Sequence, residues 1–85
     1  MISIDRIQSN FYILNVNEEV IIYFSYETPI ALVIRGHPFV SENIWSKTTG
    51  RHLNMIEPDK DKRVPYSIVQ DKIEDGLYNL TRWRR

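Results

Sequence analysis

The first half of the chain alternates between apolar and polar residues with a period of two, which predicts a series of short β-strands. Residues 11–16, 20–26, 30–34 and 39–41 are rich in aromatic and β-branched side chains, and residues 1–8 show a weaker form of the pattern. The short polar connections between these segments predict antiparallel hairpins. Segment 20–26 is apolar on both faces at its start, so we expect it at the centre of the sheet and covered on both sides there.

The pattern changes to a helical period after residue 45. Ser46 is suited to cap a helix that runs to about Glu57, because its hydroxyl can accept a hydrogen bond from a backbone N–H of the first turn. Pro58 ends this helix. Gly50 lies inside it and weakens it by roughly 1 kcal/mol relative to alanine, so the helix needs support from the rest of the fold.

Six charged residues between positions 57 and 63 predict a solvated loop, and Pro65 then marks the start of a second helix. The apolar residues that follow are spaced 3-4-4-3, and they are Tyr66, Val69, Ile73, Leu77 and Leu80. Because this stripe persists past Gly76, we expect the helix to continue through it. The order of elements predicts one α+β domain over residues 1–85, an antiparallel meander of four to five strands followed by two C-terminal helices packed on one face.

The composition narrows the kinds of site that the chain can hold. It contains no cysteine, which excludes disulfides, zinc–thiolate sites, iron–sulfur clusters and thiol catalysis. Its longest apolar run, residues 20–24, is far shorter than the roughly 18–20 residues of a membrane span, and its start shows no signal-peptide pattern. We therefore expect a cytoplasmic protein that does not act at a membrane.

The formal net charge is zero, but the two halves of the chain differ. Residues 1–44 hold two Lys/Arg against five Asp/Glu, whereas residues 45–85 hold nine against six. A neutral total argues against broad nucleic-acid binding, because such binding requires several phosphates to be neutralised at once. It leaves room for a local basic patch in the second half.

Two sequence blocks stand out against this background. The first reads Phe-Ser-Tyr-Glu-Thr-Pro-Ile-Ala at residues 24–31, and the second reads Trp-Ser-Lys-Thr-Thr-Gly-Arg-His-Leu-Asn at residues 45–54. Together they resemble a small uncharacterised domain of bacteriophage, plasmid and other mobile-element proteins, over roughly residues 10–80. The short segment 38–40 departs from the longer polar or glycine-rich inserts of that domain. The resemblance implies a setting inside a host cell and carries over no catalytic residues.

The second block is the best candidate for a binding site. On a helix that starts near Lys47, the side chains of Thr48, Arg51 and His52 share one side, where they could hold a phosphate. The competing interpretation is structural: the hydroxyls cap the helix, His52 bonds to a strand, and Trp45 fills the core. The C-terminal residues could stack on and neutralise nucleic acid, or form a solvated end. The candidate residues for binding a partner or a nucleic acid are Trp45, Lys47, Thr48, Arg51, His52, Asn54, Arg82, Trp83, Arg84 and Arg85.

Catalytic and metal chemistry have weaker support in the sequence. His37 and His52 are the only histidines and form no closely spaced pair, so a metal site would need carboxylates from elsewhere in the fold. Neither Ser25 nor Ser46 lies in the glycine elbow of a serine hydrolase. The three glycines stand apart, so no glycine-rich phosphate loop is present. We expect no catalytic residue, no metal and no cofactor.

These observations predict a non-enzymatic phage, virus or mobile-element protein that binds a macromolecular partner, a host or viral protein. A host-defence inhibitor of the anti-CRISPR or anti-restriction type is one concrete form. The first alternative is a nucleic-acid-binding accessory protein of replication or transcription, and the second is a small enzyme built on Thr48, Arg51 and His52. An aromatic patch for the protein partner would comprise Tyr12, Tyr23, Tyr26 and Trp45, unless these rings fill the core. An exposed sheet edge would also allow a homodimer.

Overall fold

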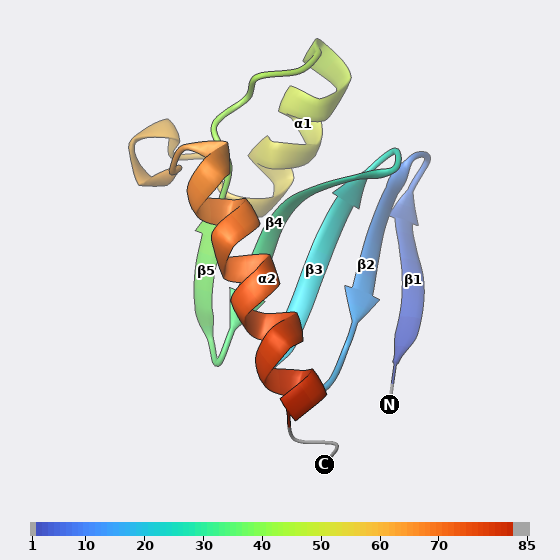
Figure 1. The fold of residues 1–85 in the computed structure, drawn as a ribbon. Coiled ribbons are helices and arrows are strands. Elements are labelled where there is room, and N and C mark those ends of the chain that lie inside the picture. Colours follow the sequence, from blue (N-terminus) through green and yellow to red (C-terminus); the bar gives the residue numbers. More distant parts are fainter. Residues whose placement is uncertain (1, 83–85) are drawn as a thin grey trace.

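The structure is a computed structural model that describes residues 2–82, with the backbone alone described for residues 77–82. Within this part of the chain, five antiparallel strands form a meander in the order β1-β2-β3-β4-β5, and two α-helices follow (Figure 1). The elements are β1 (Ser3–Gln8), β2 (Phe11–Asn15), β3 (Val20–Ser25), β4 (Thr28–Ile34), β5 (His37–Val40), α1 (Lys47–Ile56), the short 3-10 helix η1 (Lys60–Lys62) and α2 (Tyr66–Arg82). The predicted α+β class, meander and pair of C-terminal helices are confirmed.

Helix α2 covers one face of the sheet. The strand register places Leu14, Ile22 and Leu32 side by side on this face, and Val69 and Ile73 of α2 pack onto the cluster that they form. Figure 1 shows α2 crossing in front of the strands. The first part of the predicted stripe, Tyr66, Val69 and Ile73, is therefore the side that α2 packs against the sheet, whereas the side chains of Leu77 and Leu80 lie outside the described residues.

Gly76 shows why α2 continues where the sequence left a choice between an interruption and a cap. The residue is buried inside the helix, and a Cβ atom placed there would lie 3.6 Å from Ile34 and 3.8 Å from Val20. The helix therefore runs close to β3 and β4 at this point. The predicted continuation through Gly76 is confirmed.

Helix α1 packs on the other face, at one end of the sheet. The register pairs Phe11 with Ser25 and Tyr23 with Ala31 on the face opposite to α2, and Leu53 of α1 joins the cluster formed there. The prediction that both helices pack on one face is wrong in this detail. The physical reason is that α1 follows β5, which is an edge strand, and a chain leaving an edge can pass to either face.

The centre of the sheet also differs from expectation in one respect. Strand β3 is the central strand, as predicted, and α2 covers Val20 and Ile22 at its start. Ile21 points to the opposite face and is only half-buried, because α1 packs beside Ser25 at the far end of the strand. The start of β3 is therefore fully covered on one side only. No helix in the described residues is long and apolar enough to cross a membrane.

Tight turns join β4 to β5 and β3 to β4. Arg35 and Gly36 both have positive φ, 52° and 81°, which matches the twist of a two-residue hairpin and the predicted role of that glycine. Tyr26 also has a positive φ of 57°, in the turn between β3 and β4. Its backbone N–H donates to the carbonyl of Asn10 over 2.8 Å, which holds the turn against the start of β2.

Candidate functional site

The second sequence block begins α1 with the predicted cap. Ser46 has an extended backbone, and its Oγ accepts a hydrogen bond from the backbone N–H of Thr49 over 3.2 Å. The helix then runs from Lys47 to Ile56 and ends before Pro58, where the N–H of Glu57 donates to the Leu53 carbonyl. The predicted bounds of this helix are confirmed.

A buried polar cluster joins this helix to the sheet. The Oγ of Ser25 lies 2.6 Å from Nδ1 of His52 and 3.0 Å from Oγ1 of Thr49. Ser25 and His52 are each 1% exposed, and Thr49 is also buried. Ser25 belongs to the first sequence block and the other two residues to the second. The two blocks are therefore the two halves of one contact between β3 and α1.

The imidazole of His52 is enclosed by aromatic rings. It stacks on Phe11 with ring centroids 4.6 Å apart and planes 6° from parallel, and the ring of Tyr26 lies 6.4 Å away. Burial lowers the pKa of His52, because the charged imidazolium loses its hydration there. The neutral form is thus favoured, and one ring nitrogen is engaged by Ser25. For His52 this arrangement agrees with the structural interpretation of the second block.

The lowered pKa of His52 predicts a loss of stability in mild acid. In the unfolded chain the imidazole takes up a proton near pH 6.5, whereas the folded protein resists protonation until a lower pH. The contribution of neutral His52 is therefore complete above pH 6.5 and is lost as the pH falls from there through the folded pKa. We expect the free energy of unfolding to fall by at most about 1.4 kcal/mol per pH unit in this window, measured by urea denaturation between pH 7.5 and 5.

The matched controls for this pH dependence are two glutamine variants. His52→Gln removes the titrating group and should flatten the decline between pH 7.5 and 5.5. His37→Gln replaces an exposed histidine and controls for the effect of a histidine substitution as such. A wild-type protein whose stability does not change between pH 7.5 and 5.5 would contradict the assignment of a buried neutral imidazole.

Of the other candidate residues of α1, some are exposed to solvent and some contact other parts of the chain. Lys47 and Arg51 are exposed and four residues apart, whereas Thr48 is half-buried. His52 points into the core, so the expected exposed cluster of Thr48, Arg51 and His52 does not form. The Oδ1 of Asn54 accepts a hydrogen bond from Nη2 of Arg63 over 2.6 Å.

Arg63 also shows that the charged segment after α1 is more than a solvated loop. Its Nε and Nη2 atoms donate to the carbonyl of Glu57 over 3.1 Å and 2.9 Å. The same segment forms η1, which Asp59 caps by accepting from the N–H of Asp61 over 3.0 Å. These bonds tie the end of α1 to the chain that leads into α2.

Trp45 takes a core position in the structure. Its side chain is half-buried, packs against the cluster around Leu53, and meets the ring of Tyr66 edge-on with centroids 4.8 Å apart. It therefore bridges α1's side of the molecule to the start of α2. The candidate residues Trp83, Arg84 and Arg85 and the side chain of Arg82 lie outside the described residues.

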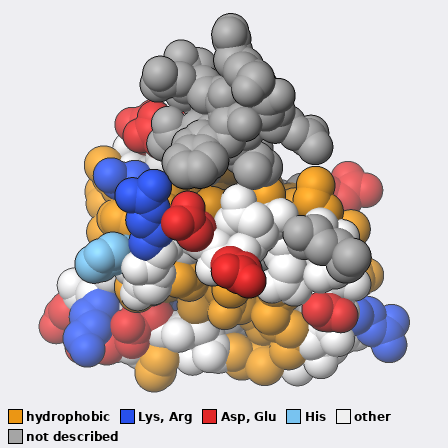
Figure 2. Space-filling view, turned by 90° about the horizontal axis from the view of Figure 1, so that it is seen from below, with side chains coloured by type: hydrophobic (Ala, Val, Ile, Leu, Met, Phe, Trp, Pro, Cys, Tyr) orange, Lys and Arg blue, Asp and Glu red, His pale blue; other side chains and the backbone are white. Residues whose placement is uncertain are grey.

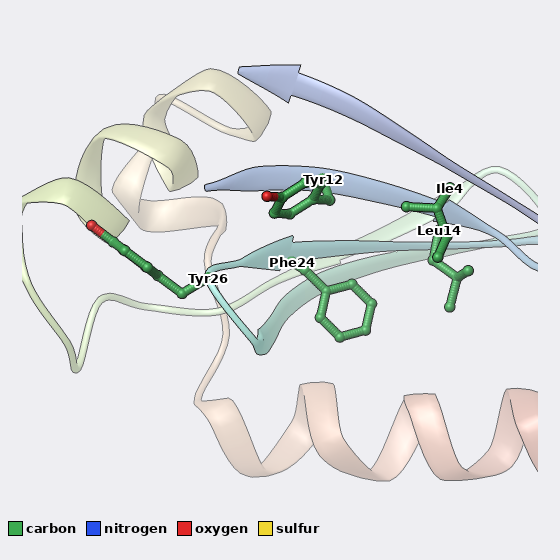
Figure 3. A pocket seen from close by; sticks show the side chains of 5 residues that line it. All are labelled: Ile4, Tyr12, Leu14, Phe24 and Tyr26. Carbon is green, nitrogen blue, oxygen red and sulfur yellow. The ribbon is translucent and has the colours of Figure 1, made fainter. Parts of the chain in front are cut away.

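A second surface, which the sequence only partly indicated, lies on the α2 face of the sheet beside β1. An apolar hollow of about 260 Å³ opens there, and its lining residues are Ile4, Tyr12, Leu14, Phe24 and Tyr26 (Figure 3). We refer to it as the apolar hollow. Tyr12 and Tyr26 belong to the aromatic patch expected from the sequence, whereas Tyr23 packs on the cluster of the opposite face. Ile4, Leu14 and Phe24 were missed as surface residues, because strand periodicity alone does not tell which parts of a face a helix covers.

The apolar hollow has a half-buried floor and an exposed rim. Leu14 and Phe24 pack against the cluster beneath α2, and Figure 3 shows the Phe24 ring pointing toward that helix. Ile4 is 69% exposed and Tyr26 is 48% exposed. Exposed apolar and aromatic side chains around a concave surface are typical of a protein-binding site.

Metal binding finds no support in the described residues. Among residues 2–82, no three His, Asp or Glu side chains gather closely enough to hold a metal ion. The only ion pair between described side chains joins Arg35 and Glu19 across the β3–β4 end of the sheet at 3.6 Å, and both side chains are exposed.

The comparisons with known proteins identify a family without a known activity. A family model described as "Family of unknown function (DUF8033)" matches residues 2–71. No curated protein and no solved structure shows significant similarity to the chain. The matched range covers all five strands, α1 and the first part of α2, so it includes both the buried polar cluster and the apolar hollow.

Proposed function

Because the chain belongs to the family of unknown function DUF8033, we propose from its surface chemistry that it is a non-enzymatic domain that binds a protein partner through the apolar hollow. The proposed setting is the host cytoplasm, and the proposed source is a phage or another mobile element, as the resemblance of the two sequence blocks implies. A host-defence inhibitor of the anti-CRISPR or anti-restriction type is the concrete form of this proposal. The proposed partner is a host or viral protein.

The single observation that carries the proposal is the apolar hollow itself. Its rim has the exposed Ile4 and Tyr26 and the half-buried Tyr12 around a floor that packs against the core, so a partner side chain placed there would be buried without rearranging the sheet. Tyrosine supplies much binding energy per residue in such positions. The Ser25–His52 pair supports the non-enzymatic part of the proposal, because a serine that is 1% exposed is screened from a substrate.

The proposal predicts that two substitutions at the rim abolish partner binding without unfolding the protein. We expect the double variant Tyr12→Thr, Tyr26→Asn to bind its partner at least about tenfold more weakly, because it removes both rings. Threonine suits the strand position and asparagine tolerates positive φ. The measurement is affinity capture from bacterial lysates with the full chain, followed by titration of the captured protein against purified wild type and variants.

The matched control is Ile44→Ser, which alters an exposed apolar residue outside the apolar hollow. A protein retained by wild type and by Ile44→Ser, but lost with the double variant, would support the proposal. A protein retained equally by all three, or no protein retained by wild type, would overturn it. Circular dichroism and urea denaturation establish that the double variant is folded.

Nucleic-acid binding is the alternative function, favoured by one observation. Lys47 and Arg51 are both exposed and lie on neighbouring turns of α1, so they could contact adjacent phosphates. This alternative requires that the protein shift the electrophoretic mobility of labelled nucleic acid, that the shift weaken steeply with salt, and that the double variant Lys47→Ala, Arg51→Ala abolish it. An absent or salt-insensitive shift eliminates it.

A further inference from the structure

Strand β1 is an open edge of the sheet with apolar side chains. It is the first strand in the sheet order, so the backbone N–H and C=O groups of its outer side point away from β2. All six of its residues are exposed, and Ile2, Ile4 and Ile7 are exposed large hydrophobic residues. A strand of this kind is a template for pairing with another strand.

At the other edge of the sheet, a later segment of the chain pairs beside the end of β5. Next to β5, the N–H of Val64 donates to the Val40 carbonyl over 2.8 Å, and the N–H of Glu42 donates to the Val64 carbonyl over 2.9 Å. Ser41 and Val64 also form a parallel bridge. The end of β5 is thus covered by residues around Val64, whereas no described segment pairs with the outer side of β1.

We propose that β1 pairs antiparallel with β1 of a second copy, with Ile4 facing Ile4 across the two-fold axis, so that the two apolar hollows join into one trough. A two-fold axis perpendicular to the sheet keeps each side chain on its own face of the sheet, and residues directly opposite each other in an antiparallel pair also share a face. The axis must therefore pass beside one residue of the strand, which then lies opposite the same residue of the second copy. The choice of that residue fixes the whole register.

The charges and the length of the ladder together select Ile4 as this residue, because an axis at Ser3 would pair only residues 2–4 of each described chain, whereas an axis at Ile4 pairs residues 2–6. An axis at Asp5 would place two carboxylates opposite each other, and an axis at Arg6 would do the same with two guanidinium groups. The irregularity between Arg6 and Gln8 disrupts any ladder that extends further along the strand.

The register at Ile4 makes every cross-strand pair compatible. Ile4 packs on Ile4, the Ser3 hydroxyl can donate to the Asp5 carboxylate, and the aliphatic part of Arg6 lies beside Ile2. Each copy contributes five residues to the ladder. The net charge of zero means that no overall repulsion opposes the approach of a second copy.

The pairing would also complete the apolar hollow. Ile4 shares the hollow's face of the sheet, because the register aligns it with Leu14 and Ile22. Seen from below, hydrophobic side chains lie on both sides of the molecule between charged ones (Figure 2). In the dimer, Ile4 of the second copy would stand at the open side of each hollow and extend its apolar wall. That the trough holds a further protein rests on the proposed function, whereas self-association does not.

The test uses the absence of cysteine in the natural chain. Residues opposite each other in an antiparallel pair have Cα atoms about 4.5–5.5 Å apart, within the range of roughly 4.4–6.8 Å that a disulfide spans. We expect Ile4→Cys to form a disulfide-linked dimer under mild oxidation at least about tenfold faster than Ile44→Cys, a matched exposed isoleucine. Asp5→Cys should be slow as well, because its two copies would lie about 8 Å apart in this register.

A second measurement does not depend on cross-linking. In sedimentation velocity, wild type should show a concentration-dependent dimer, and Ile4→Glu should dissociate at least about tenfold more readily. A wild-type protein that stays monomeric, or an Ile4→Cys variant that links no faster than Ile44→Cys, would overturn the dimer. Faster linking of Asp5→Cys than of Ile4→Cys would overturn the register. Because these experiments use the pure protein, their failure is distinguishable from a failure of partner capture.

Discussion

Replacing Leu53 with alanine is expected to lower the free energy of unfolding by about 3 kcal/mol. Leu53 is fully buried, and it is the α1 side chain that is buried within the cluster of Phe11, Ile30, Ala31 and Val40. Truncation removes its transfer energy and leaves a cavity between helix and sheet, and both effects destabilise the folded state. For a domain of this size, whose total stability is about 4–13 kcal/mol, this is a large share.

The measurement for Leu53→Ala is urea denaturation followed by circular dichroism. Met55→Ala is the matched control, because Met55 lies two residues further along the same helix, is 52% exposed, and should change the stability by less than about 0.5 kcal/mol. If Leu53→Ala does not fold, Leu53→Val should still show a loss of about 1 kcal/mol. Equal stability of Leu53→Ala and Met55→Ala would contradict the placement of α1 on the sheet.

The second large effect is expected at His52, where alanine should cost about 2–3 kcal/mol at neutral pH. The substitution removes the stack on Phe11 and the hydrogen bond to Ser25, and it opens a cavity at the β3–α1 contact. Ser25 keeps one partner, the Thr49 hydroxyl, so its hydrogen bonding is weakened without being lost. This remaining bond keeps the expected loss below that of a fully orphaned polar group.

The neighbouring variant Arg51→Ala provides the comparison for His52→Ala. Arg51 is exposed on the same turn of α1, and its truncation should leave the stability nearly unchanged. A double-mutant cycle of Ser25→Ala and His52→Ala should give a coupling energy of at least about 0.5 kcal/mol, because the two side chains are in direct contact. Additive losses would show that the hydrogen bond contributes nothing, and a loss at Arg51 as large as at His52 would contradict the buried position of the histidine.

The candidate site shows where inference from the sequence stops. The block at residues 45–54 does carry specific contacts, because Ser46 caps α1 and the side chains of Thr49 and His52 hydrogen-bond to Ser25. The sequence could not tell that His52 and Thr49 face inward to Ser25, since that contact spans more than twenty residues of chain and depends on which face of the sheet α1 meets. Helical spacing placed His52 beside Thr48 and Arg51, but spacing gives no information on what lies opposite each side of a helix.

The apolar hollow shows a second limit of inference from the sequence. Period-two alternation correctly assigned Leu14 and Phe24 to strands, and it could group residues by face. Which residues of a face become surface depends on the width of the sheet and on where α2 crosses it. Within the described side chains, α2 lies over β5, β4 and the start of β3, and the sheet extends past it to β1, so the α2 face is open beside β1.

By itself, the sequence determined the local elements of this protein. The strands, the cap of α1, the continuation of α2 and the α+β class depend on periodicity, turn residues and capping, which act over a few neighbouring residues. Only the tertiary structure decided that the helices take opposite faces, that the two sequence blocks meet in a buried polar cluster, and that β1 stays open beside an apolar hollow. The physical reason is that these features depend on contacts between residues far apart in the chain, and such contacts follow from how whole faces pack rather than from the pattern within any one segment.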